Sequence, residues 1–145
     1  MQETLKELLS NVKYSLIEEQ HIERRINEID LNIKALHYDT QRIKHNPKSK
    51  TETLILKLED LQETLIEQKI ETVNERIRIL NIITYLPDGI IRQIFELRYY
   101  DCYSWDKISN IVYLSNKQCY RYINKGLDYL VTIPEIQNII MEYEK

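Results

Sequence analysis

Two adjacent segments of the chain read Ser104-Trp105-Asp106-Lys107-Ile108-Ser109 and Ser115-Asn116-Lys117-Gln118-Cys119-Tyr120-Arg121-Tyr122. Each begins with a serine, a residue that caps helix N-termini because its hydroxyl accepts a hydrogen bond from a free backbone N–H. Gln118 stands three residues after Ser115, which is the spacing of a capping box. The segments therefore predict two short helices joined by a tight turn at Tyr113-Leu114, the layout of a helix-turn-helix.

The second predicted helix turns apolar side chains inward and polar or basic side chains outward. Its inward positions are Cys119, Tyr122, Ile123, Leu127 and Leu130. In the major groove of double-stranded DNA, asparagine and glutamine pair with adenine, whereas arginine and lysine pair with guanine. The expected DNA base or groove contacts are Asn116, Lys117, Gln118, Tyr120 and Arg121. The expected phosphate contacts, which position a protein without reading sequence, are Arg98, Lys107 and Lys125.

Gln118 is expected to divide its side chain between this groove and the cap of its own helix. The predicted caps of the two helices are Ser104 and Ser115. Trp105 is expected to anchor the core rather than to touch DNA. Tyrosines near the helix ends are expected to pack rather than to form a stacking platform for single strands. They are Tyr99, Tyr100, Tyr103, Tyr113, Tyr120 and Tyr122.

The cysteines and histidines do not predict a chemical site. Cys102 and Cys119 are too few for a disulfide framework or a zinc site, and Cys119 is expected to be a buried thiol. The three histidines lack the spacing of metal ligands. The sequence contains no nucleophile with a base and no glycine-rich phosphate loop. We therefore expect a protein that is not an enzyme and that uses no metal or cofactor.

The composition predicts an all-α protein. Only 2 glycines and 3 prolines occur in 145 residues, and a hydrophobic content of 43% excludes wholesale disorder. No apolar run approaches the roughly 18 residues that would span a bilayer, so no membrane partner is expected. The N-terminus is polar and acidic rather than signal-like, so a cytoplasmic location is expected.

The N-terminal half predicts a long antiparallel helical hairpin. Apolar residues in the first helix recur at coiled-coil spacing, at Leu5, Leu9, Val12, Leu16, Ile22, Ile26, Ile29, Ile33 and Leu36. Pro47 breaks this helix, and Ser49 with Glu52 predicts a capping box for the next. The second helix continues the pattern at Leu54, Leu58, Leu61, Leu65, Ile66, Ile70, Val73, Ile77 and Leu80. Two long helices joined by a short loop pack antiparallel.

Additional apolar residues of this half lie off the main seam. They are Leu8, Tyr14, Ile17, Leu31, Tyr38, Ile55, Leu56 and Ile79. A surface wider than one seam predicts that residues 1–85 self-associate, and we expect a homodimer. The alternative is that the rest of the same chain covers this surface.

Three segments are expected along the chain: the oligomerising hairpin 1–85, the helix-turn-helix domain 86–131, and a short C-terminal helix 132–145. Pro87 suits the first turn of the helix that opens the second segment. In the third, Thr132 and Glu135 have capping-box spacing, and Pro134 suits the first turn.

The charge distribution limits how a single chain could bind DNA. The net charge is −3, and the residues from 51 to 85 are acidic. Between Ser104 and Leu127 four basic residues face only one acid, Asp106. So small a basic patch requires a dimer or a second DNA-bound partner.

From Leu86 to Leu130 the chain resembles region 4 of the sigma-70 family. The resemblance rests on Leu86, Ile94, Leu97-Arg98-Tyr99, Ser104-Trp105-Asp106-Lys107-Ile108, Ser115, Cys119-Tyr120-Arg121, Leu127 and Leu130. The aromatic residues and long helical N-terminal part look more like phage-encoded sigma-like regulators of the ArpU and RinA type. Those families activate transcription of phage genes, notably late genes. The resemblance implies a DNA-binding activator that could contact host RNA polymerase.

The chain departs from that pattern in several places. Tyr113 stands where the turn usually carries glycine or asparagine, so a different turn geometry is expected, and Ser109 replaces the usual alanine. No segment resembles the promoter-melting region 2, which excludes a complete sigma factor. Two other classes stay open. One is a packaging protein like the phage terminase small subunit, in which the helix-turn-helix normally comes first. The other is a coiled-coil adaptor or anti-activator that binds protein.

Overall fold

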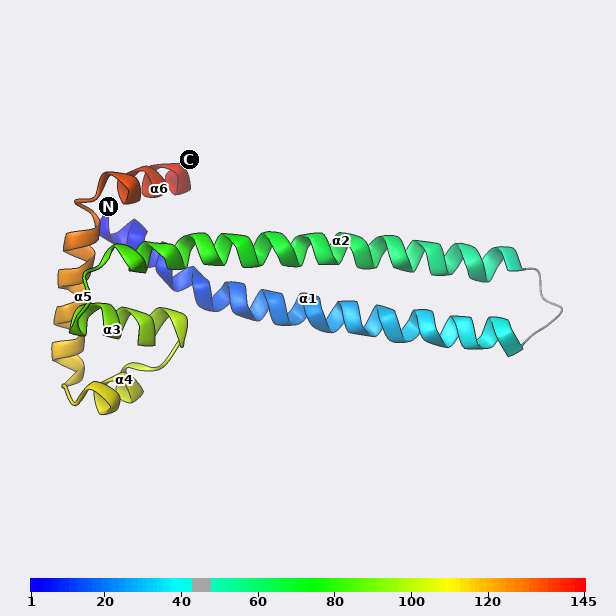
Figure 1. Ribbon diagram of the computed structural model, residues 1–145, viewed down its shortest axis with the longest axis horizontal. Helices are drawn as coiled ribbons and strands as arrows, with labels where there is room; N and C mark the ends of the chain where they lie inside the picture. Colours follow the sequence, from blue (N-terminus) through cyan, green and yellow to red (C-terminus); the bar gives the residue numbers. More distant parts are fainter. Residues whose placement is uncertain (43–47) are drawn as a thin grey trace. The chain divides into compact units, whose positions relative to one another are not determined.

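The computed structural model describes residues 1–42 and 48–145, and every regular element in these residues is helical. The all-α prediction is therefore confirmed. In chain order the elements are α1 (Gln2–Arg42), α2 (Lys48–Leu80), the 3-10 helix η1 (Asn81–Tyr85), α3 (Ile90–Phe95), the π-helical turn η2 (Glu96–Tyr100), α4 (Trp105–Val112), α5 (Asn116–Leu130) and α6 (Pro134–Glu144) (Figure 1). The break predicted at Pro47 lies outside the described residues. Ser49 belongs to the first turn of α2, but the side chain that would form the predicted capping box is outside what the structure describes. Within the described ranges, no helix has the length and apolar character needed to cross a membrane.

The chain forms two compact units. One contains residues 1–15 and 75–145, and the other contains residues 16–74. The boundary therefore crosses both long helices, and the first residues of α1 pack with the C-terminal part of the chain. The sequence boundaries after residues 85 and 131 follow helix breaks and stay predictions.

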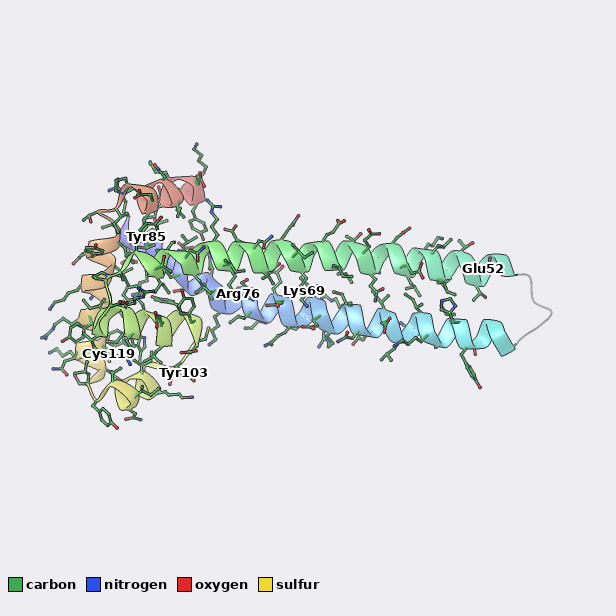
Figure 2. The ribbon with its side chains drawn as sticks, viewed as in Figure 1. Glu52, Lys69, Arg76, Tyr85, Tyr103 and Cys119 are labelled. Carbon is green, nitrogen blue, oxygen red and sulfur yellow. The ribbon has the colours of Figure 1, made fainter. Side chains whose placement is uncertain are left out.

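In the unit formed by residues 16–74, α1 and α2 pair with opposite directions. Lys69, labelled on α2 in Figure 2, pairs with Glu23 of α1, with 3.5 Å between Nζ and Oε1. Gln62 donates to the carbonyl of Ile26 at 3.2 Å. Residues later in α1 thus contact residues earlier in α2, as expected of an antiparallel pair. Apolar residues fill the seam between the two helices, with Ile22, Ile29, Ile33, Ile55 and Leu65 buried.

In the other unit, short segments from every element share one apolar core. The residues without exposed surface are Leu5, Leu9, Ile82, Ile83, Ile94, Phe95, Ile108, Cys119, Leu130, Ile136 and Ile140. The prediction that Cys119 is buried is confirmed. Burial of a dozen large apolar side chains at about 25 cal/mol per Å² is the main stabilising contribution to this unit.

Gly126 allows α5 to approach α3 closely. A Cβ at this position would lie 2.7 Å from Cζ of Phe95 and 2.9 Å from Cγ2 of Ile91. Both distances are shorter than van der Waals contact. At this separation of α3 and α5, the packing leaves no room for a Cβ at position 126 unless a neighbouring side chain shifts.

The starts of α3 and α6 can be compared with their predictions. Pro87 lies before α3 rather than in its first turn, because α3 begins at Ile90 after Gly89, which has φ +150°. The capping box predicted from Thr132 is also wrong. Its hydroxyl donates back to the Tyr129 carbonyl at 2.6 Å, and the N-cap of α6 is Ile133 without a side-chain cap. Pro134 does lie in the first turn of α6, as predicted.

The off-seam apolar residues divide into two groups. Leu8, Ile55 and Ile79 are buried within the chain. A larger group stays exposed: Tyr14, Ile17, Leu31, Tyr38 and Leu56. The chain thus covers part of this surface and leaves part open.

Candidate nucleic-acid interface

The beginnings of α4 and α5 are fixed by serine caps. Ser104 Oγ accepts from the Lys107 backbone N–H at 3.3 Å. Ser115 Oγ accepts from the Gln118 N–H at 3.2 Å, and Gln118 Oε1 accepts from the Ser115 N–H at 3.3 Å. Because these bonds satisfy N–H groups that a helix leaves free, they define where α5 starts.

Tyr113 forms the turn between α4 and α5. It has φ 58° and ψ 40°, the left-handed conformation that glycine or asparagine usually takes. The Leu114 N–H donates to the Ser109 carbonyl at 3.2 Å and closes the turn. The different turn geometry expected from a tyrosine is thus not observed in the backbone. Tyr113 as a whole is 92% exposed, so its side chain contributes little packing.

The outward face of α5 is polar and basic from Lys117 to Lys125. Lys117, Gln118, Arg121 and Lys125 are exposed, and Tyr120 is 47% exposed. Gln118 divides its side chain between this face and the cap, as described above. Asn124 is also exposed, one turn beyond Tyr120, and was missed by the sequence analysis although helical spacing places it on the same face.

Asn116 differs from these residues because it is half-buried and already bonded. Its Nδ2 donates to Oδ1 of Asp106 at 2.8 Å. Asp106 lies on α4, ten residues earlier; the sequence marked it as the one acid between Ser104 and Leu127 but not as a partner of Asn116. No periodic spacing could have revealed this pair, because the turn geometry alone brings the two side chains together.

The three residues predicted to contact phosphate all contact aromatic rings. Arg98 is half-buried, donates to the Tyr103 carbonyl at 2.9 Å and lies 4.7 Å from the centre of the Trp105 ring. Lys107 lies 3.8 Å from the centre of the Tyr103 ring, whereas the corresponding distance for Lys125 is 5.5 Å, from Tyr122. Lys107 and Lys125 remain exposed at the surface, so their charges face solvent.

An aromatic contact joins α4 to α5. The rings of Trp105 and Tyr120 lie 4.7 Å apart between their centres, tilted by 53°. Since Arg98 lies over the same indole, the three side chains form a continuous series of contacts from η2 to α5. Trp105 also packs against the core, so the orientation of Tyr120 depends on the packing behind it.

Burial affects two titratable groups behind this face. It raises the pKa of the Cys119 thiol, which lowers its reactivity at neutral pH. Burial also raises the pKa of Tyr99, and the nearby Arg98 opposes this rise. Neither group has the exposure and activating neighbours of a nucleophile.

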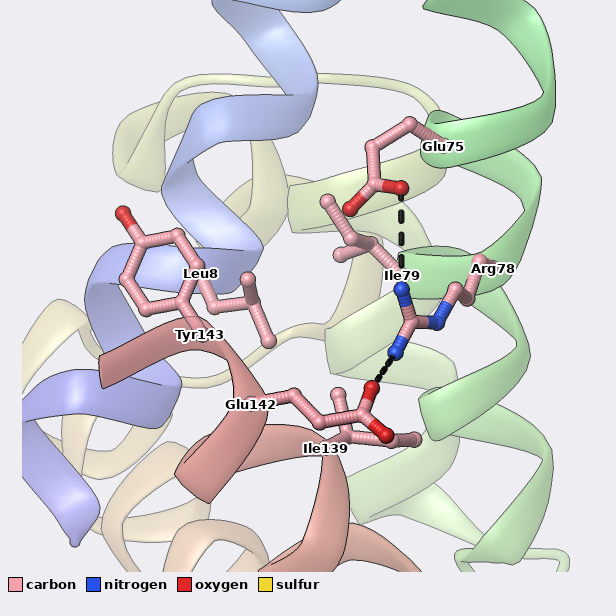
Figure 3. Close-up of a pocket in the computed structure, with 7 residues that line it drawn as sticks. All are labelled: Leu8, Glu75, Arg78, Ile79, Ile139, Glu142 and Tyr143. Atoms are coloured by element: carbon pink, nitrogen blue, oxygen red, sulfur yellow. Dashed lines mark hydrogen bonds and ion pairs between the residues drawn. The ribbon is translucent and has the colours of Figure 1, made fainter. Parts of the chain in front are cut away.

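A separate cavity of about 270 Å³ lies among α1, α2 and α6 (Figure 3). Leu8, Ile79 and Ile139 form its apolar lining. Arg78 borders it but pairs with both Glu75 and Glu142, so its charge is already compensated (Figure 3). This cavity therefore offers no free cation to an anionic ligand.

Among the described residues, no three histidine, cysteine, aspartate or glutamate side chains form a group that could hold a metal ion. The chain matches no protein-family model, no curated protein and no solved structure. The functional argument therefore rests on the chain's own residues.

Proposed function

We propose that this protein is a sequence-specific DNA-binding regulator of transcription, in which α4 and α5 form a helix-turn-helix and α5 enters the major groove. The observation that carries the proposal is the exposed row on α5, where Lys117, Tyr120 and Arg121 project from a helix whose start is fixed by a capping box. Residues of the first two turns are those that reach base edges in such modules. Asn116 and Gln118 belong to the same set, each with one bond inside the protein.

Phosphate contacts from Arg98, Lys107 and Lys125 would position the module. Lys107 and Lys125 suit this role because they are exposed, whereas Arg98 would act mainly through Trp105 and Tyr120. Phosphate contacts contribute affinity that falls with salt but carry no base specificity.

The proposed molecule is a hairpin of residues 1–85 that dimerises and carries a helix-turn-helix domain in residues 86–131. Two features support the dimer. A net charge of −3 is unfavourable for DNA binding by one small basic patch. In addition, the α1–α2 pair has an apolar groove of about 390 Å³, in which Ile66 and Ile70 are exposed. A dimer would also present two modules to two half-sites.

The biological context is proposed from the resemblance to sigma-like phage regulators. On that basis the protein activates phage or mobile-element genes, with host RNA polymerase as a partner.

The test is selection of bound duplexes from random DNA, followed by titration of the selected duplex at fixed salt. Arg121→Ala and Lys117→Ala should each weaken specific binding by about 1–3 kcal/mol while thermal melting stays unchanged. Lys13→Ala, which removes an exposed lysine from α1, is the matched control and should bind normally. Selection without enrichment, together with no salt-dependent binding, would favour the protein-binding adaptor instead.

A further inference from the structure

Asp106 and Asn116 form a polar pair at the place where α4 and α5 meet. The two side chains are bonded at 2.8 Å between Oδ1 and Nδ2. Asp106 also accepts through its backbone carbonyl from the Ser109 hydroxyl at 2.8 Å. This bond helps to fix the backbone at Asp106, and with it the position from which the carboxylate extends.

This bond determines which way the Asn116 amide faces. An ionised carboxylate only accepts hydrogen bonds, so the NH₂ group of Asn116 must face Asp106 and its carbonyl oxygen must point away. One hydrogen of Nδ2 remains free beside the Oδ1 acceptor. The amide therefore presents one donor and one acceptor in a fixed arrangement.

Adenine is the base that matches this arrangement in the major groove. Its edge offers the N7 acceptor and the N6 amino donor side by side, and an asparagine amide satisfies both. Guanine offers two acceptors at the corresponding positions, which would oppose the Asn116 oxygen. An unbonded asparagine could rotate its amide to suit guanine. Rotation of the Asn116 amide would break its hydrogen bond to Asp106.

We propose that Asp106 is a positioning residue for base recognition, which orients Asn116 so that α5 prefers adenine at one position of its site. The inference rests on the proposed function, because it requires that α5 enters the major groove. Asp106 could instead act only through its negative charge. Near the start of α4 this charge stabilises the helix through the helix dipole, and it repels DNA phosphates. The two roles predict different effects of mutation.

The experiment measures binding by fluorescence anisotropy for a panel of duplexes that carry all four bases at each position of the selected site. The variants are Asp106→Ala, Asn116→Ala and the double variant. Each single change should lower the preference for adenine by about tenfold at one and the same position. The double change should cost no more than either single change, because the two residues act as one unit.

Two further variants separate orientation from charge. Asp106→Asn removes the charge and offers a donor as well as an acceptor, so the Asn116 amide can take either orientation and part of the preference for adenine should be lost. An effect of charge alone would raise the affinity for all duplexes by the same factor. Asp128→Ala removes an exposed carboxylate near the end of α5 and should leave the preference unchanged. Thermal melting and the fluorescence of Trp105, the single tryptophan, report whether each variant keeps the native fold.

The inference is overturned if Asp106→Ala changes the affinity for all duplexes by the same factor, or if the two single changes act additively or at different positions. A wild-type protein that binds selected and scrambled duplexes equally would instead overturn the proposed function, and the inference with it. A wild-type protein that discriminates without coupling between Asp106 and Asn116 refutes the inference alone.

Discussion

Gly126 is the residue at which a single methyl group should have the largest effect. Gly126→Ala places a Cβ against the ring of Phe95, which is fully buried and cannot move without disturbing the core. Alanine favours helix by about 1 kcal/mol over glycine, but overpacking of this kind costs about 1–3 kcal/mol or more. We expect a net loss of stability of about 1–2 kcal/mol, measured by urea denaturation. Asn124→Ala, at an exposed position of the same helix, is the control and should not destabilise the protein.

Tyr113 is expected to respond in the opposite direction. Its left-handed backbone costs about 1–2 kcal/mol for a residue with a Cβ, and its exposed ring contributes little packing in return. Tyr113→Gly removes this strain but gives the unfolded chain more freedom, so a net gain of about 0.5–1 kcal/mol is expected in the same denaturation experiment. Tyr113→Ala keeps the Cβ and should bring no such gain. Equal stabilisation by both variants would contradict this explanation.

Tyr99 should make the fold sensitive to alkali. Burial raises the pKa of Tyr99 in the folded state above its ordinary value of 10.0. Above that pH the unfolded chain loses the phenolic proton while the folded chain retains it, so the unfolded state binds fewer protons and stability falls as pH rises. The contribution is complete below pH 10 and decreases above it, by at most about 1.4 kcal/mol per pH unit. Urea denaturation between pH 8 and 11 should show a shallower decline for Tyr99→Phe than for the wild type.

At the scale of the helix, the capping box stabilises the first turn of α5, which carries Asn116 and Lys117 of the outward face. Ser115→Ala removes the acceptor for the Gln118 N–H and should cost about 1 kcal/mol of stability. It should also weaken DNA binding, because Asn116 and Lys117 lie in the turn that would fray. Ser10→Ala is a matched control, since Ser10 lies exposed within α1 and its hydroxyl only returns to the Lys6 carbonyl. A loss of stability as large at Ser10 as at Ser115 would show that capping is not the cause.

Local sequence rules succeeded where the structure depends on local interactions. Ser104 and Ser115 were placed at the starts of two helices, and the inward position of Cys119 followed from helical spacing. Both properties depend on neighbouring residues along one helix. Pro134 likewise belongs to the first turn of α6 because its ring fits only there.

The same rules failed where tertiary packing decides. In the predicted capping box, the Thr132 hydroxyl would accept from a backbone N–H of α6. In the structure it donates to the carbonyl of Tyr129 on α5 instead. The π-helical turn η2 follows α3 where Phe95 and Tyr99 enter the core, with ring centres 5.6 Å apart. The pair of Asp106 and Asn116 depends on how the turn folds back, which no spacing along the chain expresses. The limits of several elements and part of the candidate site therefore depend on tertiary packing, which local sequence patterns do not express.

At the scale of the whole molecule, charge connects the proposed dimer with DNA binding. One chain offers four exposed cations at most on α4 and α5: Lys107, Lys117, Arg121 and Lys125. Each neutralised phosphate contributes about −0.9 to the slope of log affinity against log salt, so these four residues should give one module a slope of about −3.6. Arg98 is left out of this count because it is half-buried over Trp105. A dimer that places both modules on DNA should approach about −7.

Ile70→Glu should replace the salt slope of a dimer with the shallower slope of a single module. The change puts a carboxylate into the apolar groove of the α1–α2 pair at an exposed position, so the chain can still fold while the proposed contact between copies is disrupted. Light scattering should then give the mass of one chain rather than two, the helical circular dichroism signal should persist, and the salt slope should fall by about half. Gln68→Glu adds the same charge at an exposed position of α2 outside the residues that line the groove, and it should leave both mass and slope unchanged.

A wild-type protein that scatters as a single chain and still binds with a slope near −7 would refute the link between dimerisation and affinity. A ring-sized mass would instead indicate an assembly of the packaging type, because a regulator that reads two half-sites needs only two copies.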